Sequence, residues 1–278
     1  MTGRLLVCAT PIGNLGDVTQ RVLDALRTAD VVEAEDTRVT RKLLSHFGIH
    51  TPMEAYHAKN LAARTPAVVE RIACGETVAL VSDAGMPGIS DPGAALVAAC
   101  VDAGLPVEVL PGPSAIVTAL VASGLPTHAF YFGGFLPRKT GDRRRALEKL
   151  ASLDATLVFY ESPRRAAATL TDIAAVMSGR RAVLARELTK LFEEVLRAPV
   201  DELTEIVSAR ELKGEVVLLV GPPERTKAPV ELEPEEIRRA VAELMATGLS
   251  RKDAVRTVAE ETGMARNAVY GITLRGQQ

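Results

Sequence analysis

The feature that most restricts the fold of this chain is a unit that occurs three times in its first 123 residues: a short apolar run, a loop rich in glycine and proline, and a helical pattern. The runs and their loops span residues 4–9 and 10–17, 77–81 and 82–93, and 106–110 and 111–115. Short apolar runs bounded by turn residues are typical of buried strands. Strands that alternate with helices join in a parallel sheet through right-handed crossovers. The sequence therefore predicts an N-terminal α/β domain with a mostly parallel sheet and the three loops at one edge.

These three loops are candidates for a ligand site. The loop at 82–93 holds three glycines, two prolines and two aspartates, so its backbone can turn sharply and approach a ligand closely. Open α/β sheets bind ligands at the carboxyl ends of their strands. The loops carry few charges, and their apolar members suit a ligand with a flat apolar part; these members are Ile12, Leu15, Met86, Ile89 and Ala115. For any one loop alone, a tight turn without a ligand is the alternative.

The second half of the chain has a different order of elements. We predict a domain boundary at residues 123–126. Beyond it, apolar runs at 156–161 and 181–187 alternate with helical patterns, whereas the runs at 193–197 and 215–220 come close together. Close spacing suggests antiparallel pairing, so we predict a mixed second sheet.

A proline-rich segment at 222–234 separates a tail from the rest of the chain. Three helical patterns follow, at 235–246, 250–262 and 266–274, and the last two have a helix-turn-helix spacing. The predicted domains are 1–122, 126–222 and 230–278. The tail can bind nucleic acid or serve as a helical packing module, and its nearly balanced charges favour neither role.

The composition restricts which partners the chain can bind and indicates the cellular compartment in which it works. The chain has 33 basic and 35 acidic residues and a net charge of -2, so any contact with RNA requires a local basic patch. Its three cysteines are odd in number and scattered, which speaks against a disulfide framework and for a reducing compartment. Because no run approaches 18 apolar residues, we expect a cytoplasmic protein without a membrane span.

Several chemistries lack their usual sequence support. The chain has no phosphate-binding loop of the G-x-x-x-x-G-K-[ST] type, no G-x-G-x-x-G fingerprint and no G-x-S-x-G nucleophile elbow. His46 and His50 have a spacing that suits a metal on a helix, but Gly48 lies between them and no third ligand follows at a useful distance. We therefore expect no metal site.

Seven motifs occur in one order: ATPIGNLGD at 9–17, AEDTR at 34–38, VSDAGMPGISDPG at 81–93, PGPSA at 111–115, FYESP at 159–163, ARELTK at 185–190 and KGE at 213–215. As a set they closely resemble the tetrapyrrole methylase superfamily, and within it the ribosomal RNA small subunit methyltransferase I family, whose members methylate a ribose 2'-oxygen. The resemblance covers residues 4–221, and the tail resembles an appendage of some members. It implies a two-domain α/β fold with a small helical tail, and S-adenosylmethionine bound in the cleft between the domains. It also implies a homodimer that acts on a cytidine in the decoding region of small-subunit ribosomal RNA, within the assembled subunit.

One departure bears on the substrate. The first loop of the wider superfamily commonly carries a Gly-x-Gly-x-Gly-Asp run, where this chain has Thr10, Pro11, Ile12, Gly13 and Asn14. That difference favours the RNA-methylating branch. The alternatives are a tetrapyrrole C-methyltransferase and a non-catalytic RNA-binding regulatory module.

The resemblance also suggests the site residues. The matching motifs imply cofactor contacts by Pro11, Ile12, Asp83, Gly85, Met86, Ser114, Ala115, Tyr160, Glu161, Leu188, Lys213 and Gly214. A ribose hydroxyl needs a base, and the candidates are Glu35, Asp36, Glu187 and Lys190, each of which has a salt-bridged surface role as its alternative. Predicted RNA contacts are Arg38 and Arg186, the basic run with Arg138, Lys139, Arg143 and Arg144, and Arg251 and Arg266 of the tail.

Overall fold

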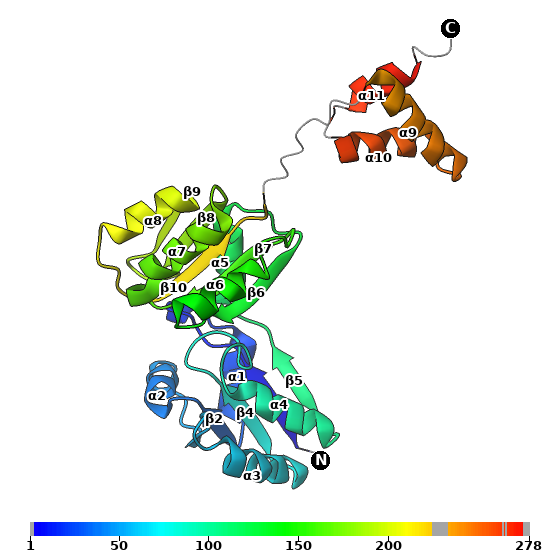
Figure 1. Ribbon diagram of the computed structural model, residues 1–278. Helices are drawn as coiled ribbons and strands as arrows, with labels where there is room; N and C mark the ends of the chain where they lie inside the picture. The colour runs from blue at the N-terminus through cyan, green and yellow to red at the C-terminus, as the bar shows by residue number, and fades with distance from the viewer. Residues whose placement is uncertain (1–2, 224–232, 263, 265, 275–278) are drawn as a thin grey trace. The chain divides into compact units, whose positions relative to one another are not determined.

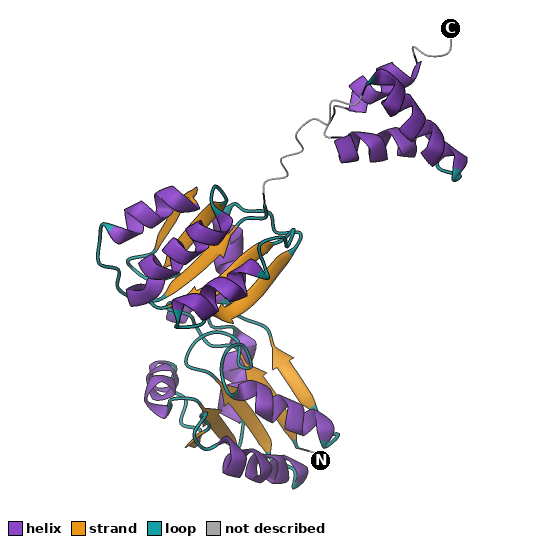
Figure 2. Ribbon diagram, in the orientation of Figure 1, coloured by secondary structure: helices purple, strands orange, loops and turns teal. Residues whose placement is uncertain are grey.

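The computed structural model describes residues 3–223, 233–262, 264 and 266–274. The chain forms two compact units, 1–223 and 224–278. Among the described residues, the first unit holds two five-stranded sheets with helices on both faces of each, and the second holds helices only (Figures 1 and 2). The prediction of an α/β fold with a helical tail is confirmed, whereas the predicted boundaries between domains stay predictions.

The first sheet is parallel throughout, with strand order β3-β2-β4-β1-β5. Its strands are β1 (Arg4–Cys8), β2 (Val31–Ala34), β3 (Met53–Ala55), β4 (Thr77–Val81) and β5 (Val107–Leu110). Side chains of a strand alternate between the two faces, so Leu6 and Cys8 pack with one set of helices while Leu5 and Val7 pack with another. The first set is α1 (Gln20–Thr28) and α2 (Thr37–His46), and the second is α3 (Leu61–Ala73) and α4 (Gly93–Asp102).

The second sheet is mixed, as predicted, with strand order β6-β7-β10-β8-β9. Its strands are β6 (Phe130–Phe135), β7 (Thr156–Glu161), β8 (Arg181–Arg186), β9 (Glu194–Pro199) and β10 (Val216–Val220). Only the β6–β7 pair is parallel. One expectation was wrong: the closely spaced runs that became β9 and β10 do not pair with each other, because β8 lies between them and pairs antiparallel with both.

Helices cover the second sheet unequally. One face packs against α6 (Thr140–Glu148), α7 (Pro163–Met177) and α8 (Val200–Ser208). The other face packs against α5 (Ala115–Ser123) through Ile116, Ala119 and Leu120. Because α5 directly follows the last loop of the first sheet, its N-terminus brings that loop to the second sheet.

The second unit has its own small core. Its helices are α9 (Pro234–Ala246), α10 (Arg251–Thr262) and α11 (Arg266–Leu274), and Ile237, Val255 and Val269 are among the buried side chains between them. The Ser250 hydroxyl accepts a hydrogen bond from the Asp253 amide at 3.2 Å and so caps the start of α10. Most of the predicted linker lies outside the described residues.

Candidate functional site

The first two predicted ligand loops are joined to each other. The Thr10 amide donates to the Gly85 carbonyl at 2.9 Å, and the Gly85 amide donates to the Thr10 carbonyl at 3.0 Å. Gly85 has φ +80°, a conformation that side chains disfavour. Within the longer loop, the Asp91 carboxylate accepts the amides of Gly88 and Gly93 at 2.7–3.0 Å. Asp91 therefore organises the loop, and hydrogen bonds within the protein hold both loops in place.

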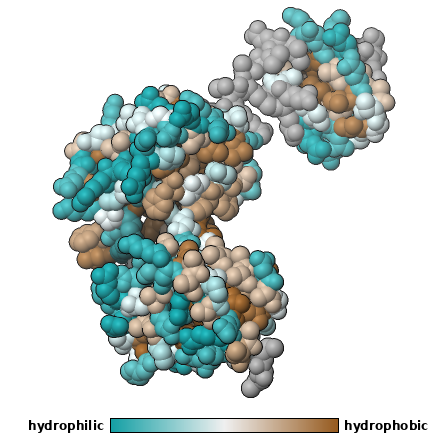
Figure 3. Space-filling view, turned by 60° about the horizontal axis from the view of Figure 1, so that its bottom comes forward, coloured by the Kyte–Doolittle hydropathy of each residue, from teal (hydrophilic) through white to brown (hydrophobic). Residues whose placement is uncertain are grey.

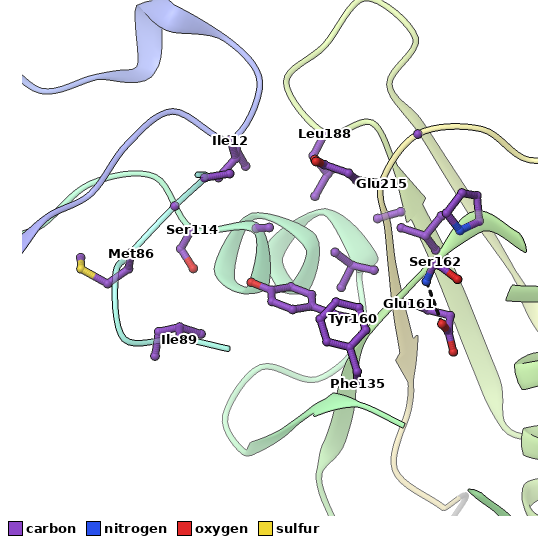
Figure 4. Close-up of a pocket in the computed structure, with 18 residues that line it drawn as sticks. Ile12, Met86, Ile89, Ser114, Phe135, Tyr160, Glu161, Ser162, Leu188 and Glu215 are labelled. Atoms are coloured by element: carbon purple, nitrogen blue, oxygen red, sulfur yellow. Dashed lines mark hydrogen bonds between the residues drawn. The ribbon is translucent and has the colours of Figure 1, made fainter. Parts of the chain in front are cut away.

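A cavity of about 370 Å³ opens between these loops and the second sheet. Figure 3 shows a recess between the two halves of the first unit, with apolar side chains on its walls. Figure 4 shows Ile12, Met86, Ile89 and Ser114 on one side and Leu188, Glu161 and Glu215 on the other, with the Tyr160 ring between them. The volume lies in the range of small-molecule sites.

Most of the predicted cofactor residues line this cavity. The ones that do are Ile12, Gly85, Met86, Ser114, Ala115, Tyr160, Glu161, Leu188 and Gly214. Lys213 does not; its carbonyl accepts a hydrogen bond from Arg186 at 3.2 Å. Pro11 and Asp83 also do not, since they line a second cavity of about 160 Å³. Their assignment as cofactor contacts stays a prediction.

Sequence reasoning missed some members of the larger cavity. Phe135, Ser162 and Glu215 line it as well. The Phe135 ring lies 5.6 Å from that of Tyr160, and a register shift between Phe132 and Phe135 interrupts the pairing of β6 with β7. The two glycines before Phe135 were the available signal, since glycine inside a strand often marks such a bulge.

Polar groups of the cavity fall into two kinds. The Glu161 carboxylate is already satisfied, because it accepts the Thr169 hydroxyl at 2.6 Å and the Ser162 amide at 2.7 Å. Ser114, by contrast, is the N-cap of α5 and makes no side-chain cap bond. Its hydroxyl and the first amides of the helix are therefore suited to bind a polar ligand group.

The two predicted acidic residues after β2, Glu35 and Asp36, have different surroundings. Asp36 caps α2, and its carboxylate accepts hydrogen bonds from the Arg38 guanidinium, which lowers the pKa of Asp36 to about 2. Glu35 is different: burial raises its pKa, and the negative charges of Asp83 and Asp91 raise it further. Of the two, Glu35 is the better proton acceptor, because Asp36 is held as a paired anion.

Glu187 and Lys190 lie together in a strained loop after β8. Glu187 and Thr189 have φ of +52° and +66°, and such strain is common at functional sites. The Lys190 ammonium donates to Glu187 at 2.8 Å and to Glu215 at 3.1 Å. Burial alone would lower the pKa of Lys190, but these carboxylates raise it on balance, while the ammonium lowers the pKa of Glu187. Lys190 is thus held as a cation, and its stem packs on Gly13 of the first loop.

The predicted RNA-binding residues differ in exposure. Arg38, Arg138, Lys139 and Arg266 are exposed, Arg144 is 45% exposed, and Arg186 and Arg251 are half-buried. Arg143 is the exception, because its side chain is 4% exposed and pairs with the buried Asp172 at 2.5 Å. A buried guanidinium cannot reach a polyanion, so the prediction for Arg143 was wrong and its role is structural.

Two global properties can be stated of the described residues. None of their helices is both long and apolar enough to cross a membrane. In the same part of the chain, no cluster of His, Cys, Asp and Glu has the composition of a metal site.

Comparisons with known proteins agree with this geometry. The model of the family "Tetrapyrrole (Corrin/Porphyrin) Methylases" matches residues 4–204, and that of the "RsmI C-terminal HTH domain" matches residues 231–276. Among solved structures, the methyltransferase CobJ has a TM-score of 0.60 at 22% identity, over 79% of this chain and 94% of its own. Uroporphyrin-III C-methyltransferase from Thermus thermophilus, complexed with S-adenosyl homocysteine, has a TM-score of 0.56 at 20% identity, over 79% and 97%. The family model covers most of the chain, so the protein is a tetrapyrrole methylase, and the solved structures share its fold.

Full-length relatives narrow the assignment. The "Ribosomal RNA small subunit methyltransferase I" of Halalkalibacterium halodurans is 44% identical over 97% of this chain and 94% of its own length. The protein of the same name from Escherichia coli O157:H7 is 45% identical over 99% and 96%. The chain belongs to the ribosomal RNA small subunit methyltransferase I family.

S-adenosylmethionine is the methyl donor of this family, and the cavity fits it. Ile12, Met86, Leu188 and the Tyr160 ring offer apolar walls to a flat adenine. The uncapped N-terminus at Ser114 suits a carboxylate or a sugar hydroxyl.

Proposed function

We propose that this chain methylates the ribose 2'-oxygen of a cytidine in the decoding region of small-subunit ribosomal RNA, with S-adenosylmethionine as donor. The observation that carries the proposal is the cavity between the sheets, which has the volume, the apolar walls and the helix N-terminus that the donor needs. The printed name of the full-length relatives supports ribosomal RNA as the acceptor.

The chain's own residues have a limited task in this reaction. The donor supplies a methyl group that is already activated by its attachment to positively charged sulfur. Tyr160, Met86 and Leu188 hold the ligand in one orientation and exclude water, and alignment of reacting groups accounts for much of the acceleration in such reactions. The loops that carry Thr10 and Gly85 are preorganised by their mutual hydrogen bonds.

The ribose hydroxyl must lose its proton as the new oxygen–carbon bond forms. Of the four candidates, Asp36 is stabilised as an anion by Arg38 and Lys190 is held protonated by two carboxylates. The pKa of Glu187 is lowered, whereas that of Glu35 is raised. Glu35 also lies beside the loop at 82–93, where its carboxylate accepts the Asp83 amide at 3.4 Å. We therefore propose that the Glu35 carboxylate takes the proton and that Lys190 acts as a fixed positive charge.

Exposed basic groups support the RNA contact. Arg38 is 85% exposed in side-chain area, and Arg138 and Lys139 are exposed beyond β6. We propose that these residues, with Arg144, Arg186, Arg251 and Arg266, meet phosphates of the substrate, since phosphate contacts position a nucleic acid without reading its sequence. The assembled small subunit in the cytoplasm is the proposed target.

A homodimer is also proposed. Val121 and Val117 on α5 are 71% and 53% exposed, and Val109 on the edge strand β5 is 53% exposed. Apolar side chains on an edge strand and on a helix surface support contact with a second copy.

The experiment that tests the activity is methyl transfer from labelled donor to three acceptors: undermethylated small subunits, free small-subunit RNA and uroporphyrinogen. We expect label in the subunits and none in the tetrapyrrole. Label in uroporphyrinogen alone would establish the C-methyltransferase alternative. Tight donor binding without transfer to any acceptor would establish the regulatory alternative.

A further inference from the structure

A bulge in β6 turns the Phe135 side chain toward the donor cavity. From Phe132 to Phe135 this strand advances three residues, while the paired strand β7 advances only two, from Val158 to Tyr160. Side chains of a strand alternate between its two faces, so one extra residue moves every later side chain to the opposite face. Phe132 and Phe135 therefore share the face of the sheet that carries Tyr160 and packs against α5.

Two glycines make this bulge possible. A Cβ added to Gly133 would lie 2.6 Å from the Phe159 ring, and Gly134 has φ +60°, which side chains disfavour. Bulges next to functional sites commonly redirect one side chain. The chain after the bulge is fixed as well, because the Arg165 guanidinium donates to the Leu136 carbonyl at 2.8 Å. The aromatic side chain that follows the glycines is therefore held in place from both sides.

Burial does not explain why Phe135 is placed there. The residue lines the donor cavity, yet it is 58% exposed. Figure 4 shows its ring next to that of Tyr160, and the ring centroids are 5.6 Å apart. An aromatic residue stabilises a fold through the apolar surface that it buries, and this one leaves most of its surface open. A ring that the backbone presents at the edge of a ligand cavity is suited to contact a second flat molecule.

The charges that follow Phe135 indicate the kind of molecule. Arg138 and Lys139 are both exposed, and the three or four residues of chain that separate them from Phe135 span at most about 14 Å. Asp142, the one acid between residues 138 and 145, already pairs with Arg145. A flat apolar surface beside two cations fits single-stranded RNA, whose bases stack on aromatic rings and whose phosphates attract cations.

We propose that the Phe135 ring stacks with an unpaired base of the acceptor RNA while Arg138 and Lys139 meet the neighbouring phosphates; this inference rests on the proposed function. The faces of a base inside a double helix are covered by its neighbours, so only an unpaired nucleotide can offer its face to a side chain. The ring thus holds the acceptor strand at the edge of the donor cavity, and the enzyme takes an unpaired nucleotide rather than one within a duplex.

The first test is the kinetics of methyl transfer to undermethylated small subunits. Phe135→Leu keeps an apolar side chain but loses the aromatic face, so we expect KM for the subunits to rise about tenfold with little change in kcat. Phe135→Tyr keeps the ring and is expected to retain the wild-type KM. Phe130→Leu is the matched control, because Phe130 is 47% exposed and lies on the same strand, about 16 Å away. A wild-type KM in Phe135→Leu, or an equal rise in Phe130→Leu, would overturn the proposal.

Two measurements on folded Phe135→Leu separate this role from others. Its affinity for S-adenosylmethionine, measured by calorimetry, is expected to match that of the wild type, and a loss of about tenfold would assign the ring to the donor instead. Its mass in light scattering is also expected to match, and a change would assign the ring to a contact between copies of the chain. Either change would overturn the proposal. Failure of the wild type to methylate small-subunit RNA would overturn the proposed function itself, so the two failures are distinguishable.

Discussion

Replacement of Gly214 by alanine tests how the backbone shapes the donor cavity. Gly214 lines the cavity at φ +88°, and an added Cβ would lie 2.3 Å from Cδ of Glu187. The conformation costs an L residue about 1–2 kcal/mol. Glu187 must also move, and loss of its bond from the Glu215 amide, now 3.0 Å, costs about 1.5–3 kcal/mol. The lower limits of these two costs add to about 2.5 kcal/mol. If half of that free energy is lost from donor binding, the affinity for the donor drops about tenfold.

Isothermal titration calorimetry with S-adenosylmethionine measures this effect, and thermal unfolding reports on the fold. Gly104→Ala is the matched control, because Gly104 has φ +68° and an added Cβ meets no atom within 4 Å. The control is expected to lose stability without losing donor affinity. Wild-type affinity in folded Gly214→Ala, or an equal loss of affinity in Gly104→Ala, would refute the reasoning.

Three further predictions concern stability and assembly. Arg143→Met breaks the buried pair with Asp172 and should destabilise the fold by about 3 kcal/mol, whereas Arg144→Met should cost under about 1 kcal/mol, both read from urea unfolding; equal losses would contradict the structural role of Arg143. The pKa of Asp36 is lowered from its ordinary 3.8 to about 2 in the folded protein. Its contribution to the stability of the fold is therefore present above pH 4 and is lost as the pH falls toward 2. Asp36→Asn should therefore flatten the decline of the urea midpoint over that range. Val121→Glu should convert the proposed dimer to a monomer in light scattering, and a persistent dimer would exclude α5 from the interface.

Periodicity was enough to predict most of the fold. Buried strands such as Thr77–Val81 are continuous apolar runs because both faces of their sheet are covered by helices. The strand Met53–Ala55 escaped prediction, since three half-buried residues carry no such signal. Helix Val200–Ser208 also escaped, because its N-cap, Pro199, is the last residue of β9 and no loop separates the two elements.

The sequence predicted site residues where a loop carries a recognisable motif. It did not predict which side chains face a cavity and which face the core. Motif matching cannot tell that Pro11 and Ile12 line different cavities, because the sequence of a loop does not show the direction of each side chain. The basic run after Pro137 looks uniform in sequence. Arg143 nevertheless stands one turn before the buried Leu147, and this helical spacing was the available sign that it faces the core.

Nuclease digestion and mass spectrometry of small subunits treated with the protein and S-adenosylmethionine test the central claim most directly. The account predicts one added methyl group on the ribose 2'-oxygen of one cytidine in the decoding region. A methyl group on a base, or no added methyl group on the RNA, would contradict it.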